Sequence, residues 1–384
     1  MRFEFATAAR IIFGEGTLRE IHSLAPKLGS RPLIITGQTE ERYRPLLAIL
    51  SEAGLDVLTF AVSGEPTVEI VREGAEYARE HGRDFVLGIG GGSVIDAGKA
   101  ISALITNWGE TLDYLEVIGR GQPLTEAPVP YIAIPTTAGT GAEVTRNAVL
   151  GSPAHQVKVS MRSLHLLPGV ALVDPELTYS MPPDITASTG MDALTQVIEP
   201  FVSKQANPLT DAICREGIRR AAKSLIQAYQ DGGDRAARRD MSLASLFGGL
   251  ALANARLGAV HGFAGPLGGM VEAAHGAICG RLLPPVMQVN LSALKARRAN
   301  EAALGRYQEI AQILTGDPEA QPEDGLDWLW SLDRTLNLPP LADYGLQRAD
   351  FPRLIEMASK SSSMQGNPLE LTEDEMQEIL ERAF

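Results

Sequence analysis

The chain has 384 residues, which is enough for two domains that each bury a core of their own. Hydrophobic residues make up 45% of it and charged residues 21%, a balance typical of folded globular proteins and not of disordered ones. The formal net charge of −13 argues against nucleic acid or an anionic membrane as a partner, because both require clustered Lys and Arg. A small anionic ligand needs only a local pocket and remains compatible with this charge.

The cysteine content and the amino terminus favour a cytoplasmic protein. Cys214 and Cys279 are far apart in a chain of this size and do not suggest a disulfide framework. Residues 1–13 lack the apolar core of a signal peptide, so none is expected. The weakly charged stretch 241–271 contains Arg256 and is rich in Gly and Ala, which predicts buried helices and no membrane span.

The first half of the chain alternates short apolar runs with stretches of helical spacing. Strands are expected at residues 31–36, 55–62, 85–89 and 131–135, and helices at residues 43–53 and 68–81. Strands separated by helices of this length indicate βαβ units and a mainly parallel sheet. Open sheets of this kind bind ligands at the carboxyl ends of their strands.

The pattern changes near Pro182, after which helical periodicity dominates. Helices are expected at residues 184–201, 208–229, 236–254, 291–314 and 322–336. We therefore predict an α/β nucleotide-binding domain over residues 1–182 and a helical, metal-binding domain over residues 183–384. A last amphipathic helix is expected over residues 372–384, with Thr372 as its N-cap before Glu375.

A glycine-rich run follows the expected strand at 85–89. Residues 90–99 read GGGSVIDAGK, where glycines allow backbone N–H groups to approach a pyrophosphate and the helix N-terminus adds positive charge. Ser93 offers a further donor. The run matches neither G-x-G-x-x-G nor a Walker loop, so a tight turn without ligand is the alternative. Lys99, one turn into the helix, is a less secure part of this site, and a solvated charge is the alternative.

A second run, residues 134–145, reads IPTTAGTGAEVT and also leaves an expected strand. Its threonine hydroxyls and flexible backbone suit a ribose or a phosphate, although Thr and Gly are also common in turns.

These two runs occur in order with DPELT at 174–178, GMDALTQVIEPFVS at 190–203, GAVHGFAGPLGG at 258–269 and AAHGAICGRLLP at 273–284. Together they closely resemble the iron-containing (group III) alcohol dehydrogenases over nearly the whole chain. The resemblance implies the architecture shared with dehydroquinate synthase: an α/β domain that holds a nicotinamide cofactor and an all-α domain that holds a divalent metal. It implies an NAD(P)-dependent alcohol dehydrogenase or aldehyde reductase that forms homodimers or larger homo-oligomers.

The resemblance also assigns cofactor residues. Gly91, Gly92 and Ser93 would hold the pyrophosphate, and Asp96 would lie near the nicotinamide end. The remaining residues implied for the cofactor cleft and the reacting centre are Thr136, Thr137, Thr140, Asn147 and Lys158. For Lys158, an exposed charge on a loop with His155 is the alternative.

Residue 37 bears on the choice between NAD and NADP. Family members that prefer NAD commonly carry an Asp there, which binds the adenosine ribose and repels a 2′-phosphate. This chain has Gly37, with Arg42 nearby in sequence, which favours NADP. The alternative is that Gly37 only forms a turn, in which case this residue does not distinguish NAD from NADP.

The family's metal ligands are an Asp, a His one helical turn later and two more His. The matching residues here are Asp192, Gln196, His261 and His275. A carboxylate and two imidazoles can bind Fe²⁺ or Zn²⁺, but an amide oxygen is a poor fourth ligand, so we expect weaker or altered metal binding. The alternative is that both histidines are ordinary buried residues without metal.

A further departure concerns proton transfer. The family often has a second His four residues after the first, where this chain has Gly265. Water, a ribose hydroxyl or another side chain must then carry the proton.

The resulting hypothesis is metal-assisted hydride transfer between a nicotinamide and a small alcohol or aldehyde. Phe263 and Asn147 are expected to shape the substrate pocket. The expected catalytic residues are Asp192, His261, His275, Lys158 and Asn147. The alternatives are a metal-independent reductase that resembles maleylacetate reductases and a nucleotide-binding protein without catalysis; a lyase of the dehydroquinate synthase type is disfavoured.

Overall fold

The computed structural model describes residues 2–155, 157–298 and 300–384 and divides the chain into two compact units. The first, the α/β unit, consists of Ala6–Thr137 and Gly141–Tyr179. The second, the helical unit, consists of Ser180–Phe384 with the short segment Ala138–Thr140 and the first residues of the chain.

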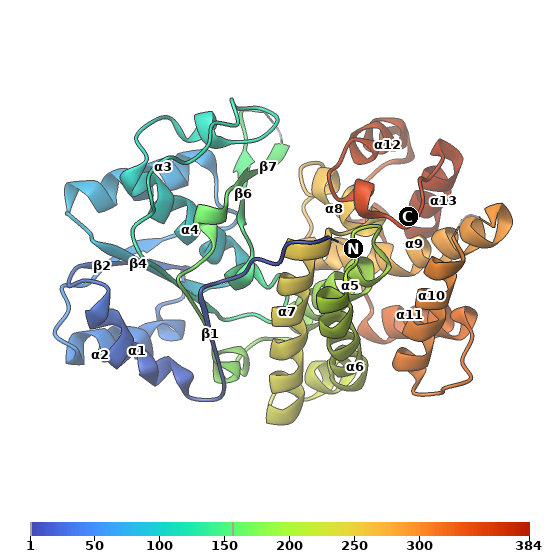
Figure 1. The fold of residues 1–384 in the computed structure, drawn as a ribbon, viewed down its shortest axis with the longest axis horizontal. Helices are drawn as coiled ribbons and strands as arrows, with labels where there is room; N and C mark the ends of the chain where they lie inside the picture. Colours follow the sequence, from blue (N-terminus) through green and yellow to red (C-terminus); the bar gives the residue numbers. More distant parts are fainter. Residues whose placement is uncertain (1, 156, 299) are drawn as a thin grey trace. The chain divides into compact units, whose positions relative to one another are not determined.

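The α/β unit is built around a six-stranded sheet (Figure 1). Its strands, in the order in which they lie side by side, are β1 (Arg10–Phe13), β8 (Val170–Val173), β5 (Tyr131–Pro135), β4 (Phe85–Gly90), β2 (Pro32–Thr36) and β3 (Leu58–Ala61). All pairings between these strands are parallel, which confirms the expected fold class. A separate antiparallel hairpin, β6 (Asn147–Ser152) with β7 (Val157–Arg162), is a feature that the sequence pattern does not predict.

Helices cover both faces of the sheet. On one face lie α1 (Ile21–Leu24) and α2 (Arg44–Glu52), and on the other α3 (Val68–Glu80) and α4 (Gly92–Thr106) (Figure 1). Ile34 of β2 packs in the core with α1 and α2, whereas its neighbours Leu33 and Ile35 pack in the core with α3 and α4. Because both faces are buried, β2 and β4 are continuous apolar runs that the sequence could predict.

The connections that follow the neighbouring strands β2 and β4 lead to opposite sides of the sheet. After β2 the chain passes to β3 on one side, whereas after β4 it passes to β5 on the other. Thr36 at the end of β2 pairs with Ile89 near the end of β4, so Gly37 and Gly91 leave the same edge of the sheet. Ligands of open parallel sheets bind at such a reversal, outside the carboxyl ends of the strands.

The helical unit surrounds one central helix, α5. Its helices are α5 (Pro183–Val202), α6 (Pro208–Gln230), α7 (Arg235–Ala255), α8 (Ala259–Leu267), α9 (His275–Arg297), α10 (Glu301–Thr315), α11 (Pro322–Leu336), α12 (Phe351–Ser359) and α13 (Glu373–Ala383). Helices α6, α7 and α9 pack around α5, and residues 190–202 of α5 are all buried. A polar side chain on α5 therefore lies inside the unit and needs partners there.

One expected helix is wrong. The periodicity over residues 291–314 predicts a single helix, but the structure has the end of α9 and the start of α10 there. Arg298 adopts a left-handed conformation, with φ 48°, and ends α9. The side chain of Asn300 then accepts a hydrogen bond from the Ala303 N–H and caps α10. Apolar spacing continues across this break, which is why periodicity alone merges the two helices.

The end of the chain follows the prediction. Thr372 caps α13, and Thr372 and Glu375 form a reciprocal capping box.

Candidate functional site

Polar side chains lie on one face of the buried helix α5. Asp192, Gln196 and Glu199 follow one another at spacings of four and three residues, which places them on the same side of the helix. All three are buried. Because a buried carboxylate is costly unless it is paired, these residues identify the interior of the helical unit as a place for charge chemistry.

His261, on the short helix α8, lies against two of these carboxylates. Its Nε2 is 3.2 Å from Asp192 Oδ1, and its Nδ1 is 2.6 Å from Glu199 Oε2. Glu199 Oε1 also accepts a hydrogen bond of 2.7 Å from the Val260 N–H. Glu199 thus fixes both the ring of His261 and the backbone that carries it, and leaves Nε2 directed at Asp192.

Helix α9 brings the other histidine to the same place. His275 begins this helix, and Cys279 follows one turn later on the same face. The Cys279 sulfur lies 3.6 Å from His275 Nε2 and 3.7 Å from His261 Nε2. Potential ligand atoms of Asp192, His261, His275 and Cys279 all lie within 4.8 Å of one another. The structure therefore brings together three of the four predicted metal residues and adds a thiol.

Two glycines allow α9 to approach α5 this closely. A Cβ on Gly276 would fall 2.2 Å from the Ser188 carbonyl oxygen, and a Cβ on Gly280 would fall 2.5 Å from Leu338 Cδ1 and 2.9 Å from Met191 Cβ. A larger residue at either position would push His275 and Cys279 away from Asp192.

Gln196, the fourth predicted ligand, is engaged differently. Its Nε2 donates a 3.3 Å hydrogen bond to the Gly139 carbonyl. Its Oε1 is buried and has no hydrogen-bond partner among the described residues. A buried acceptor of this kind is usually satisfied by an ordered water, or by a donor or cation of a bound group.

Charges within the cluster shift the pKa of its members. Burial alone would raise the pKa of Asp192, but its hydrogen bond with His261 and the charges of both histidines hold it below the usual range. Burial alone would lower the pKa of His261, yet Cys279, Asp192 and Glu199 raise it well above the usual range. The pKa of Cys279 is lowered, against the effect of burial, by His261 and His275. The shifts pair anionic Asp192 and Cys279 with protonated histidines, and a divalent cation would stabilise the same anions in place of those protons.

Sequence reasoning missed Glu199 and Cys279. Glu199 lies seven residues after Asp192, and Cys279 lies four residues after His275, so helical spacing places each beside a predicted ligand. That spacing was the available signal for both.

In the α/β unit, helix α4 begins directly after the glycine-rich run. Gly91 precedes the helix in an extended conformation, and Gly92 and Ser93 form its first turn. The N–H groups of a first turn have no partner within the helix and face outward along its axis. Thr136 leaves the neighbouring strand β5, and its N–H donates to the Gly90 carbonyl at 2.9 Å. The run thus joins a parallel strand to the N-terminus of a helix, and its role as a pyrophosphate cradle stays a prediction.

Tyr131 packs β5 against this helix. Its hydroxyl donates to the Ile95 carbonyl at 3.0 Å, and it lies where a Cβ on Gly88 or Gly98 would fall, 2.3 Å and 2.5 Å away respectively. These glycines therefore permit the close contact of strand and helix that sets the start of α4.

Lys99 is not a solvated charge, which was the alternative that the sequence left open. It is completely buried, and its ammonium donates to Asp96 Oδ1 at 3.0 Å, Thr145 Oγ1 at 2.8 Å and the Asn147 carbonyl at 2.7 Å. Asp96 Oδ2 accepts a further hydrogen bond of 3.0 Å from the Val149 N–H. Burial raises the pKa of Asp96, although Lys99 opposes this. The pair ties α4 to strand β6.

Asn147 and Lys158 lie on the hairpin, but not beside each other. Asn147 pairs with Arg162, whereas Lys158 pairs with Gly151 towards the other end of β6. The Lys158 ammonium lies 3.3 Å from Glu65 Oε1. Thr137 lies against Gly91, and Thr140 belongs to the short segment of the helical unit.

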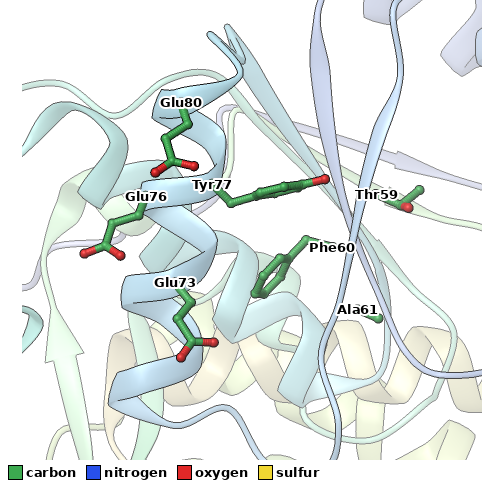
Figure 2. Close-up of a pocket in the computed structure, with 7 residues that line it drawn as sticks. All are labelled: Thr59, Phe60, Ala61, Glu73, Glu76, Tyr77 and Glu80. Carbon is green, nitrogen blue, oxygen red and sulfur yellow. The ribbon is translucent and has the colours of Figure 1, made fainter.

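A surface hollow of about 460 Å³ lies apart from these residues. Figure 2 shows that it is formed by β3 and α3, with three glutamates around Tyr77 and Phe60. One of these glutamates, Glu76, pairs with Arg72 at 3.1 Å. None of the predicted site residues lines this hollow, and we assign no function to it.

Among the described residues, no single helix is long and apolar enough to cross a membrane; only the pair α7 and α8, bent by 98°, meets that test jointly.

Comparison with known proteins identifies the family. The model for iron-containing alcohol dehydrogenases matches residues 8–175, and the model for the C-terminal region of the Fe-containing alcohol dehydrogenase family matches residues 186–384. A 1,3-propanediol dehydrogenase of Klebsiella pneumoniae is 38% identical over 392 residues, which cover 100% of this chain and 99% of the relative. Alcohol dehydrogenase 4 of Saccharomyces cerevisiae is 35% identical over 385 residues, which cover 97% and 96%.

A solved structure of a 1,3-propanediol oxidoreductase superimposes with a TM-score of 0.93, at 33% identity and 100% coverage of both chains. The chain therefore belongs to the iron-containing alcohol dehydrogenase family. It is an oxidoreductase that acts on CH–OH groups, in a family that uses NAD(P) and a divalent metal.

Proposed function

We propose that this chain interconverts short aldehydes and primary alcohols with NADP(H), and that Asp192, His261 and His275 hold the divalent metal. The convergence of these three side chains in the helical unit carries the proposal. They supply one carboxylate and two imidazoles from three helices, with ligand atoms within 4.8 Å of one another. This donor set suits Fe²⁺ or Zn²⁺. The unpartnered Gln196 Oε1 is a further sign that a bound group completes the site.

The proposed cofactor residues lie in the α/β unit, apart from Thr140, which lies in the segment Ala138–Thr140 of the helical unit. Gly91, Gly92 and Ser93 would receive the pyrophosphate at the start of α4, beside the reversal between β2 and β4. The other residues proposed for the cofactor cleft and reacting centre are Gly37, Asp96, Thr136, Thr137, Thr140, Asn147 and Lys158. We keep the division into domains at residues 182 and 183 as part of this proposal.

In the proposed reaction, a hydride passes from the reduced nicotinamide to the carbonyl carbon, and a proton passes to the carbonyl oxygen. When bound, the metal supplies a Lewis acid that polarises the substrate oxygen. The chain's own contribution is to hold His261 in place through Glu199, beside Asp192 and His275, and to orient the cofactor. Gly265 has no side chain to donate a proton, so water, a ribose hydroxyl or another side chain would deliver it.

The absence of a carboxylate at residue 37 supports NADP. A Cβ at Gly37 would meet no heavy atom within 4 Å, so open space lies beside the end of β2. Arg42, on the exposed turn Glu40–Arg42, is the cation nearest in sequence for a 2′-phosphate. The relatives use both cofactors, since a butanol dehydrogenase of Clostridium saccharobutylicum is described as NADPH-dependent and a methanol dehydrogenase of Bacillus methanolicus as NAD-dependent.

The first experiment measures metal content together with oxidation of NADPH and NADH by propanal, butanal and 3-hydroxypropanal, before and after chelation. Activity that is lost on chelation and restored by Fe²⁺ or Zn²⁺ supports the proposal. Turnover that is indifferent to chelation in metal-free protein identifies a metal-independent reductase. Cofactor binding without turnover on any substrate identifies a nucleotide-binding protein without catalysis.

Assembly and location are also proposals. The family resemblance supports a homodimer or larger homo-oligomer, which light scattering would test. The two free, buried cysteines support a reducing compartment such as the cytoplasm.

A further inference from the structure

The site has a donor that the family's ligand set does not include. In that set, the residue one turn after the aspartate on this helix is a histidine, whereas here it is Gln196. The Gln196 amide nitrogen is held by the Gly139 carbonyl. Cys279 lies on α9, one turn after His275. The chain thus has two potential ligands one turn apart on α9, His275 and Cys279. On α5, the corresponding pair of the family is incomplete, because Gln196 replaces the histidine that follows the aspartate.

The distances around the Cys279 sulfur match those within a tetrahedral metal site. An ion about 2.3 Å from sulfur and about 2.0–2.1 Å from nitrogen separates the two ligand atoms by about 3.6 Å at a tetrahedral angle and about 3.1 Å at a right angle. The sulfur is 3.6 Å from His275 Nε2 and 3.7 Å from His261 Nε2. Asp192 Oδ1 and His261 Nε2 are 3.2 Å apart, close to the roughly 3.3 Å expected between oxygen and nitrogen ligands.

The same atoms are joined by hydrogen bonds when His261 is protonated on both nitrogens, since it then donates to Glu199 and to Asp192 Oδ1, and the Cys279 sulfur is nearly equidistant from the two Nε2 atoms. When His261 is neutral and Glu199 accepts from its Nδ1–H, Nε2 presents a lone pair on the side of Asp192 and Cys279. A divalent cation can then take the place of the proton among the four potential ligand atoms, which lie within 4.8 Å of one another.

We propose that Cys279 is the fourth protein ligand of this metal, in place of the histidine missing at residue 196, and that the Asp-His-His-Cys set selects Zn²⁺ over Fe²⁺. A thiolate is a softer ligand than imidazole or carboxylate and favours zinc. Asp192 and a Cys279 thiolate together carry two negative charges, which balance a divalent ion. The inference rests on the proposed metal site and adds the ligand and the metal preference.

The decisive measurement is spectroscopic and requires no turnover. Metal-free protein is loaded with Co²⁺, and the near-ultraviolet thiolate-to-cobalt charge-transfer band is recorded for the native chain, Cys279→Ser and Cys214→Ser. Cys214 is the matched control, because it is also a buried free thiol of the helical unit but lies in the apolar core on α6. We expect the band in the native chain and in Cys214→Ser, and its loss in Cys279→Ser. A native protein that binds Co²⁺ without the band, or a band that survives in Cys279→Ser, overturns the proposal.

X-ray absorption of the zinc-loaded native chain keeps the test valid if Cys279→Ser does not fold. One sulfur at about 2.3 Å from zinc supports the proposal, and a shell of nitrogen and oxygen alone contradicts it.

Metal preference is tested by anaerobic competition between equimolar Zn²⁺ and Fe²⁺ for metal-free protein. The zinc-to-iron ratio bound should fall at least about 10-fold in Cys279→Ser, and Gln196→His in that background should restore iron binding. A ratio unchanged by Cys279→Ser contradicts the selectivity. Failure of the proposed function appears separately, as metal-loaded protein with the cobalt band but without aldehyde turnover.

Discussion

Nδ1 of His261 on helix α8 lies 2.6 Å from Oε2 of Glu199 on helix α5, and both side chains are buried. The carboxylate also accepts a hydrogen bond from the Val260 N–H, so it holds the ring and its backbone together. A carboxylate behind a histidine fixes the ring's orientation and makes its other nitrogen a better metal ligand. Glu199 therefore acts as a positioning residue for the proposed metal site.

Glu199→Gln should lower metal affinity by about 10–100-fold, because the neutral amide makes His261 a weaker ligand. The measurement is competition with a chelator of known affinity, with circular dichroism to confirm the fold. Glu381→Gln serves as the control, since Glu381 is not part of the metal cluster. Its Oε2 forms an ion pair with Arg348 Nε at 2.9 Å near the end of the chain. Equal affinities of Glu199→Gln and the native chain would remove Glu199 from the site.

The parts of the fold that the sequence could predict are those whose pattern is local. β2 and β4 are buried on both faces, so they stand out as apolar runs. The helix Pro322–Leu336 has Pro at its first position, which marks its start. The hairpin of β6 and β7 is not predicted, because β6 alternates partly exposed and buried residues but β7 begins with two partly exposed residues, so the local pattern is weak.

The site was predicted less completely, for a physical reason. The motifs identified Asp192, His261 and His275, but pairing across elements is invisible in one sequence. Lys99 illustrates this, because two of its partners, Thr145 and Asn147, lie 46 and 48 residues away. Only the folded chain shows that a lysine one turn into a helix is completely buried.

Gly265→His tests the missing proton relay. Gly265 lies within α8, and a Cβ there would meet no heavy atom within 4 Å, so a side chain can start from this position without displacing a neighbour. We expect kcat for aldehyde reduction to rise by roughly 10-fold or more, with a new ionisation in the pH profile. Gly265→Ala is the control: it should share the stability gain of up to about 1 kcal/mol from replacing a helical glycine, without the gain in rate. Equal rates for both variants would place proton transfer elsewhere.

Gly37→Asp tests the cofactor preference. The open space at Gly37 accepts the new carboxylate, which would repel a 2′-phosphate and bind a ribose hydroxyl. The ratio of kcat/KM for NADPH to that for NADH should fall by about 10-fold or more, because one desolvated charge contact contributes over 1 kcal/mol. Arg42→Ala should lower the same ratio in the native background. If neither variant changes this ratio of kcat/KM values, residue 37 does not contact the adenosine ribose or its 2′-phosphate.

Glu143 gives the α/β unit a pH-dependent stability. This carboxyl is buried, and burial raises its pKa from 4.5 to about 7, partly opposed by its backbone hydrogen bond and Lys99. Between these two values the native state binds a proton that the unfolded chain has released, so the free energy of unfolding falls as pH rises. The contribution is complete below about 4.5 and is lost above about 7, with a total of roughly 3 kcal/mol.

Glu143→Gln should remove this dependence, because the amide stays neutral at every pH. The variant should unfold with nearly the same free energy as the native chain at pH 4.5 and be more stable by roughly 3 kcal/mol at pH 8. Urea unfolding at both pH values measures the difference, and Glu52→Gln, at an exposed position of α2, is the control that should show none. If the advantage of Glu143→Gln does not grow between the two pH values, Glu143 does not titrate in this range, and the Lys99 ammonium holds it ionised throughout.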